Sequence, residues 1–501
     1  MSGPIPSERQ PTVAGPGYSR WLVPPAALAV HLSIGQAYAY SVFKVPLTRV
    51  IGVDHPAPDD WTQPQIAWVF TIFIVFLGLS AAVFGRWLER VGPRRAGVVA
   101  ACCWGGGYLI AALAVQTHQL WLLYLGNGVI GGCGLGLGYI SPVSTLIKWF
   151  PDRRGMATGM AIMGFGGGAL IGAPLADLLM QRFATDTSAG VAQTFVAMGL
   201  LYFVAMLAGA LGYRVPPPGW TPRRWTPPAR RGAATGERYV EVHVAWRTPQ
   251  FTLLWIVLFT NVTAGIGILE QASPMIQECF AGTVGASAGA GFVGLLSIAN
   301  IAGRIGWASA SDRIGRKATY FVFFALGIVM YALVPAAGRS GQVPLFVALF
   351  AVLLTMYGGG FATIPAYLAD LFGTRLVGAI HGRLLTAWAT AGVAGPLLVN
   401  LIRQQQIDAG VPLAQVYDTT MYVLAGILAV GFVANLLVRT VADRHFLGAG
   451  APPVGAADRV TAAPGPHRRP WPQLLLAWTA VGLPLAWGIF ETLRKAAQLF
   501  R

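Results

Sequence analysis

Long apolar runs are the feature that most limits how this chain of 501 residues can fold. Runs of about 20 residues recur from Trp21 to the C-terminus, and each is long enough to cross a hydrocarbon core of about 30 Å as an α-helix. Only 11% of the residues are charged, whereas an average soluble domain has roughly a quarter. We therefore predict an all-α membrane protein and not a soluble enzyme.

The apolar runs form two sets of six, separated by a polar stretch. The first set lies near residues 22–45, 65–85, 97–116, 120–147, 157–180 and 192–213. The second set lies near residues 250–272, 287–310, 318–338, 343–369, 381–403 and 419–440. The sequence thus predicts an N-terminal tail (1–20), a six-helix half (21–213), a cytoplasmic linker (214–249), a second six-helix half (250–440), a polar basic tail (441–470) and an extra C-terminal hydrophobic helix (471–501).

The basic residues lie in alternate loops. The net charge is +16, and 26 of the 35 Lys and Arg residues lie in the loops and tails on the same side as the N-terminus. Because loops rich in Lys and Arg stay in the cytoplasm, we expect a multi-pass protein of the inner (plasma) membrane with a cytoplasmic N-terminus. The positive charge therefore requires no nucleic-acid partner, and the lipid bilayer is the expected surrounding.

The last apolar run, Trp471 to Phe490, is just long enough to cross the membrane and contains Pro484. If it crosses, Arg494, Lys495 and Arg501 lie outside, against the charge rule. A crossing helix and an interfacial or re-entrant helix therefore both remain open.

No cofactor, metal site or catalytic group is expected. Cys102, Cys103 and Cys133 fall inside apolar runs, and Cys279 lies near an outer loop, without the spacing of metal ligands. We interpret the four cysteines as packing residues. Because no nucleophile, metal or cofactor constellation is present in the sequence, an enzyme is the least favoured interpretation.

A short motif occurs once in each half, after the second and the eighth run. Residues 85–95 read GRWLERVGPRR and residues 308–317 read ASASDRIGRK, and their acids are 223 positions apart. Ion pairs between such an acid and neighbouring helices can hold one face closed and must break when it opens. The motif therefore predicts a gate latch made of Glu89, Arg90, Arg94, Asp312, Arg313 and Arg316. The alternative is that the Arg residues only set the topology.

The duplicated motif resembles the loop between helices 2 and 3 of major facilitator superfamily transporters, which is usually repeated between helices 8 and 9. A narrower resemblance, to the oxalate/formate antiporter family, rests on stretches near Tyr38 to Leu47, Lys148 to Gly159, Pro217 to Trp220, Asn300 to Arg313 and Asp370 to Thr374. The segment from Trp471 to Phe500 resembles a short single-span companion protein of such transporters, here fused. The resemblance implies twelve transmembrane helices in two halves.

Arg304 is the candidate anion-binding residue. It lies eight residues before Asp312, about 12 Å inside the helix end. Arg at this depth costs roughly 2.5 to 3.5 kcal/mol or more, so it is a candidate for binding an anion in a water-filled cavity. The resemblance also implies that an Arg of helix 8 binds the carboxylate substrate. The alternatives are snorkelling to the surface and an ion pair with a carboxylate of another helix.

The resembled family uses a second intramembrane cation for oxalate, a Lys placed three residues after a Trp in helix 11. Here Trp388 is followed by Ala391 at that place, and Lys44 lies at the outer end of the first run. A single fixed positive charge leaves the second carboxylate of a dianion uncompensated in a low dielectric. The expected substrate is therefore a monocarboxylate such as formate, lactate or pyruvate rather than oxalate.

The resemblance further implies that aromatic residues line the cavity beside Arg304, at positions that match or approximate those of the family. The candidates are Tyr38, Tyr139, Tyr357, Phe361 and Trp388. Tyr357 and Phe361 share one helix face because they are four residues apart. Each of the five is equally consistent with helix packing when taken alone.

These features predict a secondary active carrier of small organic anions that works by alternating access, as an antiporter with a counter-anion or as a proton symporter. His31, Gln36, Asp177 and Glu270 are the other polar residues in or near the runs, and they do not decide between the two. One alternative is a major facilitator exporter of drug-like molecules, which an ion-paired Arg304 favours. The other is a non-transporting membrane sensor, which requires a folded signalling domain.

Overall fold

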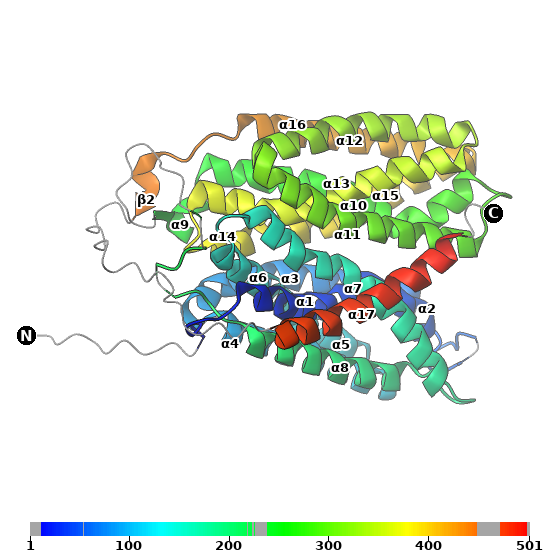
Figure 1. Cartoon of the computed structure of the whole chain (residues 1–501). Helices are drawn as coiled ribbons and strands as arrows, with labels where there is room; N and C mark the ends of the chain where they lie inside the picture. Colours follow the sequence, from blue (N-terminus) through cyan, green and yellow to red (C-terminus); the bar gives the residue numbers. More distant parts are fainter. Residues whose placement is uncertain are drawn as a thin grey trace, which may run out of the picture.

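The computed structural model describes residues 12–53, 55–217, 219–222, 225, 238–447 and 471–497. Within them the fold consists of two helical bundles that meet along a seam, with α1 to α8 below and α10 to α16 above in Figure 1. Residues 1–11 of the predicted N-terminal tail, much of the predicted linker and residues 448–470 of the predicted basic tail lie outside the described residues.

The N-terminal bundle holds the first six predicted runs. Its elements are η1 (Arg20–Leu22), α1 (Val23–Ile34), η2 (Gly35–Phe43), α2 (Lys44–Leu47), α3 (Gln63–Val91), α4 (Pro93–Gln116), α5 (Leu120–Leu123), η3 (Tyr124–Gly131), α6 (Gly132–Trp149), α7 (Arg154–Phe183) and α8 (Val191–Gly212).

The C-terminal bundle holds the second six. Its elements are α10 (Pro249–Cys279), α11 (Ala286–Ile314), α12 (Arg316–Arg339), α13 (Val343–Phe372), α14 (Val377–Leu384), α15 (Thr386–Asp408), η4 (Leu413–Gln415) and α16 (Asp418–Leu437). The short α9 (Val242–Ala245) precedes α10, and η5 (Asp443–His445) follows α16.

The glycine of the duplicated motif has the same conformation in both halves. Gly92 ends α3 with φ 85°, and Gly315 ends α11 with φ 88°. Residues that have a Cβ atom rarely adopt a positive φ. Gly therefore allows the chain to reverse sharply between two helices. The repeated spacing of acid and Gly therefore fixes where each helix ends relative to its acid.

The predicted fold of twelve helices in two halves with an extra C-terminal helix is confirmed. Twelve helices of the described residues are long and apolar enough to cross a membrane, and these include α17 (Trp471–Ala496). The first predicted run is not among them because it is divided into α1, the 3₁₀ segment η2 and α2. With this divided span, the described residues cross the bundle thirteen times.

The extra helix α17 lies across the seam and contacts both halves (Figure 1). A Cβ on Gly488 would lie 2.6 Å from the carbonyl oxygen of Leu170 on α7, and a Cβ on Gly294 of α11 would lie 2.3 Å from the Thr492 methyl group. The helix contacts η1 at one end of the bundle and passes Gly294 near the start of α11 at the other. This placement favours a crossing helix over an interfacial one.

The described part of the linker pairs with the segment after α16. The two-residue strand β1 (Tyr239–Val240) is antiparallel to β2 (Phe446–Leu447), and Arg238 forms an ion pair of 2.6 Å with Asp443. We refer to the end of the bundle that carries these segments as the linker end.

We expect close packing of α11 on α13 to depend on Gly303. A Cβ at Gly303 would lie 2.0 Å from the carbonyl oxygen of Thr355, whereas a Cβ at Gly306, one turn later, meets nothing within 4 Å. Gly303→Ala should therefore lower the thermal unfolding midpoint of the detergent-solubilised protein by several degrees, in line with an overpacking cost of about 1 to 3 kcal/mol.

The matched control is Gly306→Ala, which should leave the midpoint unchanged or raise it slightly, because Ala restricts the unfolded chain. Equal midpoints for the two variants would show that α11 and α13 do not pack as described.

Candidate functional site

Arg304 lies in α11 and is completely buried, with 0% exposure. Its Nε donates to Oδ1 of Asn300, one turn earlier, at 2.9 Å. Its Nη1 donates to the carbonyl oxygen of Ile162 on α7 at 2.8 Å. The guanidinium therefore reaches from the C-terminal bundle to the N-terminal bundle.

The guanidinium has spare hydrogen-bonding capacity. Nη2 has no hydrogen-bond partner, and no Asp or Glu of the described residues forms an ion pair with Arg304. Its Cζ lies 5.7 Å from the ring of Phe165 and 5.4 Å from that of Phe361, within the range of cation–π contacts. Complete burial argues against snorkelling, so an uncompensated cation is left in the centre of the bundle.

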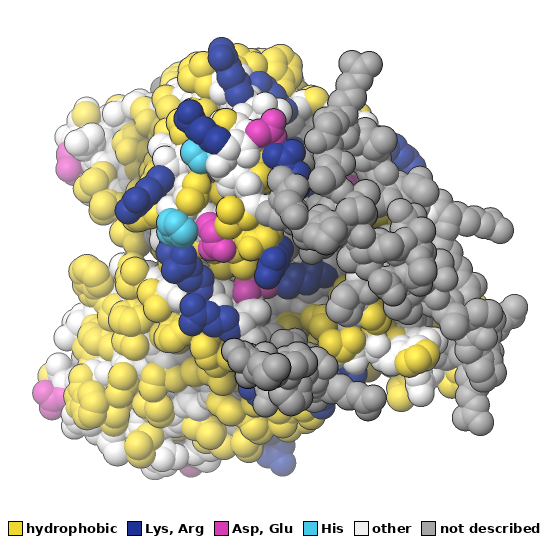
Figure 2. All heavy atoms as spheres, turned by 90° about the vertical axis from the view of Figure 1, so that its left-hand side faces the viewer, with side chains coloured by type: hydrophobic (Ala, Val, Ile, Leu, Met, Phe, Trp, Pro, Cys, Tyr) yellow, Lys and Arg dark blue, Asp and Glu magenta, His cyan; other side chains and the backbone are white. Residues whose placement is uncertain are grey.

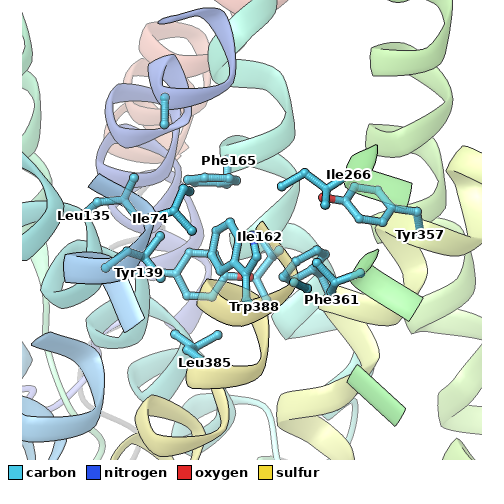
Figure 3. Packing of buried hydrophobic residues seen from close by; sticks show 14 of the residues in the cluster. Ile74, Leu135, Tyr139, Ile162, Phe165, Ile266, Tyr357, Phe361, Leu385 and Trp388 are labelled. Carbon is cyan, nitrogen blue, oxygen red and sulfur yellow. The ribbon is translucent and has the colours of Figure 1, made fainter. Parts of the chain in front are cut away.

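All five predicted aromatic residues belong to one group of contacting rings, which reaches Arg304 through Phe361, and Figure 3 shows four of them, Tyr139, Tyr357, Phe361 and Trp388. Trp388 is central, with its ring 4.8 Å from Phe361, 5.1 Å from Tyr139 and 5.2 Å from Phe165. Tyr38 and Tyr357 join the two halves through a hydroxyl–hydroxyl hydrogen bond of 3.0 Å. We call these residues, together with Phe165, the aromatic cluster.

Two members of the aromatic cluster carry polar atoms without partners. The Tyr139 hydroxyl and the Trp388 Nε1 are buried and make no hydrogen bond within the part of the chain that the structure describes. Buried donors usually have acceptors, so donors left open beside a cation indicate a place for an anionic oxygen. Trp388 lies on α15 just after the break between α14 and α15, which turns its ring toward the cluster.

Glu89, the acid of the first motif copy, joins the two halves at the linker end. Its carboxylate accepts hydrogen bonds from Ser144 Oγ at 2.9 Å and Lys148 Nζ at 2.7 Å, both on α6. It also accepts from the backbone N–H of Gly378 at 3.1 Å, in the first turn of α14. A carboxylate at a helix N-terminus is favourable because unpaired N–H groups and the helix dipole attract it.

Asp312, the acid of the second copy, makes the corresponding contact in the opposite direction. It accepts from the backbone N–H groups of Gly155 at 2.8 Å and Met156 at 2.9 Å, at the start of α7. Arg316 donates to Asp312 at 2.6 Å. Each motif acid therefore binds the N-terminus of a helix in the other half.

Asp370 adds an ion-pair bridge beside Asp312. Its carboxylate pairs with Arg154 of α7 at 2.8 Å and with Arg316 at 3.1 Å. Thr158, one turn into α7, also donates to the carbonyl oxygen of Ala362 on α13 at 2.6 Å. Figure 2 shows this end, where Lys and Arg side chains gather around acidic ones.

The other predicted latch residues lie apart from these contacts. Arg90 and Arg313 are exposed, and Arg94 is partly exposed. Sequence reasoning did not identify Lys148, Arg154 and Asp370 as latch partners, although they lie in two stretches that carry the family resemblance. Among the described residues no three His, Cys, Asp or Glu side chains are placed to hold a metal ion, and the four cysteines are free.

Comparisons with known proteins agree with this architecture. The model of the Major Facilitator Superfamily matches residues 18–396. The oxalate:formate antiporter of Oxalobacter formigenes is 26% identical over 74% of this chain and 81% of its own length. Human monocarboxylate transporter 11 is 26% identical over 79% of this chain and 80% of its own.

A solved structure shares the fold. The transporter FucP, crystallised in the outward conformation, matches with a TM-score of 0.62 at 13% identity, over 84% of this chain and all of that one. The predicted resemblance to the major facilitator superfamily is confirmed by the family model that matches residues 18–396.

We expect Asp312→Asn to weaken closure of the linker end. The amide keeps the size of the side chain but loses the charge that binds Arg316 and the α7 N-terminus, and charged hydrogen bonds contribute about 1.5 to 3 kcal/mol each. Double electron–electron resonance between spin labels on exposed positions 95 and 314, in a background without native cysteines, should show a new population at longer distance.

Asp443→Asn is the control, because the Asp443–Arg238 pair does not join the two bundles and its carboxylate is exposed. An unchanged distance distribution for Asp312→Asn would contradict the latch.

Proposed function

The chain belongs to the major facilitator superfamily, and we propose that it carries small organic monocarboxylates, such as formate, lactate or pyruvate, across the inner membrane. The observation that carries the proposal is the buried guanidinium of Arg304 without a carboxylate partner among the described residues. Burial of an unpaired charge is costly, and a bound anion removes that cost. The site thus acquires its counter-ion from the substrate.

The surroundings of Arg304 support an anion over a drug-like molecule. An exporter of amphipathic compounds is favoured if Arg304 pairs with an acid, and no such pair exists among the described residues. The open donors Arg304 Nη2, Tyr139 Oη and Trp388 Nε1 all suit carboxylate oxygens. The names of the relatives, an oxalate:formate antiporter and a monocarboxylate transporter, point to the same chemical class.

The expected charge of the substrate is a single negative charge. Ala391, which stands where the resembled family has its second cation for oxalate, is buried one turn after Trp388. A dianion would leave one carboxylate without a partner in a low dielectric. We therefore infer preference for monoanions.

The linker-end contacts support alternating access. Glu89, Asp312 and Asp370 hold the two bundles together at one end through contacts with helix N-termini and Arg side chains. The excess of Lys and Arg in the loops of that end assigns it to the cytoplasm. The described arrangement is then the state closed to the cytoplasm, and transport requires these contacts to break.

Uptake of radiolabelled formate, lactate and oxalate into proteoliposomes tests the proposal. Arg304→Ala should lower monocarboxylate uptake at subsaturating concentration by roughly 30-fold or more, because loss of one partner of a buried charged contact costs about 2 to 5 kcal/mol. Arg95→Ala, at an exposed position of α4, should transport like wild type.

Two results would overturn the proposal. Folded wild-type protein that moves none of the monocarboxylates would remove the substrate class. Oxalate uptake at a rate comparable with the monocarboxylates would remove the preference for monoanions.

A further inference from the structure

We propose that His31 binds a coupling proton, so that each monocarboxylate crosses together with one proton; this rests on the proposed function. His31 lies on α1 and is completely buried. Its Nδ1 lies 2.5 Å from the carbonyl oxygen of Ala161 on α7, and its Nε2 lies 3.2 Å from the carbonyl oxygen of Tyr139 on α6. Both ring nitrogens thus face backbone acceptors.

This arrangement suits an imidazolium better than a neutral imidazole. A carbonyl oxygen only accepts, and a neutral histidine has one N–H, so one nitrogen lone pair must face an oxygen lone pair. The protonated ring has two N–H groups and satisfies both carbonyls. The acceptors for the second proton are therefore already in place.

The proposed proton site is adjacent to the anion site. Ala161 and Ile162 are consecutive residues of α7, and the carbonyl of Ile162 accepts from Arg304. The ring of Tyr139 lies 5.2 Å from that of His31 and 5.1 Å from that of Trp388. The proposed proton site and anion site therefore meet at consecutive carbonyl groups of α7, which His31 contacts from the N-terminal half and Arg304 from the C-terminal half.

Electrostatics explains why the proton and the anion bind together. Burial and the positive charge of Arg304 both oppose an imidazolium when the site is empty. A bound carboxylate adds one negative charge beside both groups, and this charge stabilises the protonated form of His31. The empty site and the site loaded with one proton and one anion then carry the same net charge, so the loaded carrier reorients without moving extra charge across the membrane.

The titratable and charged groups that face His31 are few. Among the described residues they are Tyr139 of α6, Arg304 of α11 and, across the Tyr139 ring, His381 of α14. His381 is equally buried, but both of its ring nitrogens lack partners. His31 is the better proton site because only His31 has acceptors placed for two N–H groups.

Proteoliposomes that contain the pH dye pyranine test the assignment. For wild type, lactate added outside should acidify the lumen, and an external pH one unit below the internal pH should drive about tenfold accumulation of labelled lactate, as expected for one proton per anion. His31→Gln should lose both the acidification and the pH-driven accumulation, while exchange of labelled against unlabelled lactate falls less than tenfold.

Three further variants make the test decisive. His31→Asn is the second substitution in case the Gln variant does not fold, and His243→Gln, at an exposed position, controls for loss of a histidine and should behave like wild type. Coupling that survives in His31→Gln and His31→Asn, or that is lost only in His381→Gln, would overturn the assignment.

The wild-type protein separates this inference from the proposed function. Saturable lactate exchange without proton movement would leave the proposed function standing and remove the proton site. Absence of both exchange and net uptake would instead remove the proposed function.

Discussion

An arginine buried in a low dielectric without an acidic partner among the described residues is the constraint around which the centre of this protein is organised. Asn300, the Ile162 carbonyl and two aromatic faces stabilise Arg304 in part. None of these contacts neutralises the charge. The centre of the bundle is therefore incomplete in the absence of a ligand, and a carrier needs such a centre, since substrate must bind favourably and still leave.

The linker end uses the same physical groups for the opposite purpose. There the charges are acids, and they are satisfied by helix N-termini of the other half as well as by Arg and Lys. Backbone N–H groups at a helix start are fixed by the fold. They can therefore bind the acid only when the two halves have one particular position relative to each other. The duplicated motif thus supplies two equivalent clamps, one donated by each half to the other.

The fold was predictable because hydrophobic length and charge alternation are local properties, and the run predicted at 65–85 lies inside the helix Gln63–Val91. Arg304 was singled out because an intramembrane cation is conspicuous in sequence, whereas its aromatic neighbours were predicted from the family resemblance. The division of the first span at Gly35 and the pairing of Arg154 with Asp370 were not predicted. Such features depend on which helices face one another across the seam. Local sequence patterns do not indicate which helices these are.

The extra helix α17 contacts α1 and α7 of the N-terminal half and α11 of the C-terminal half. Any motion of one half relative to the other must therefore change the packing of α17 on at least one of them. The close approaches at Gly488 and Gly294 thus bear on how far the two halves can move apart, as well as on how well the extra helix is held.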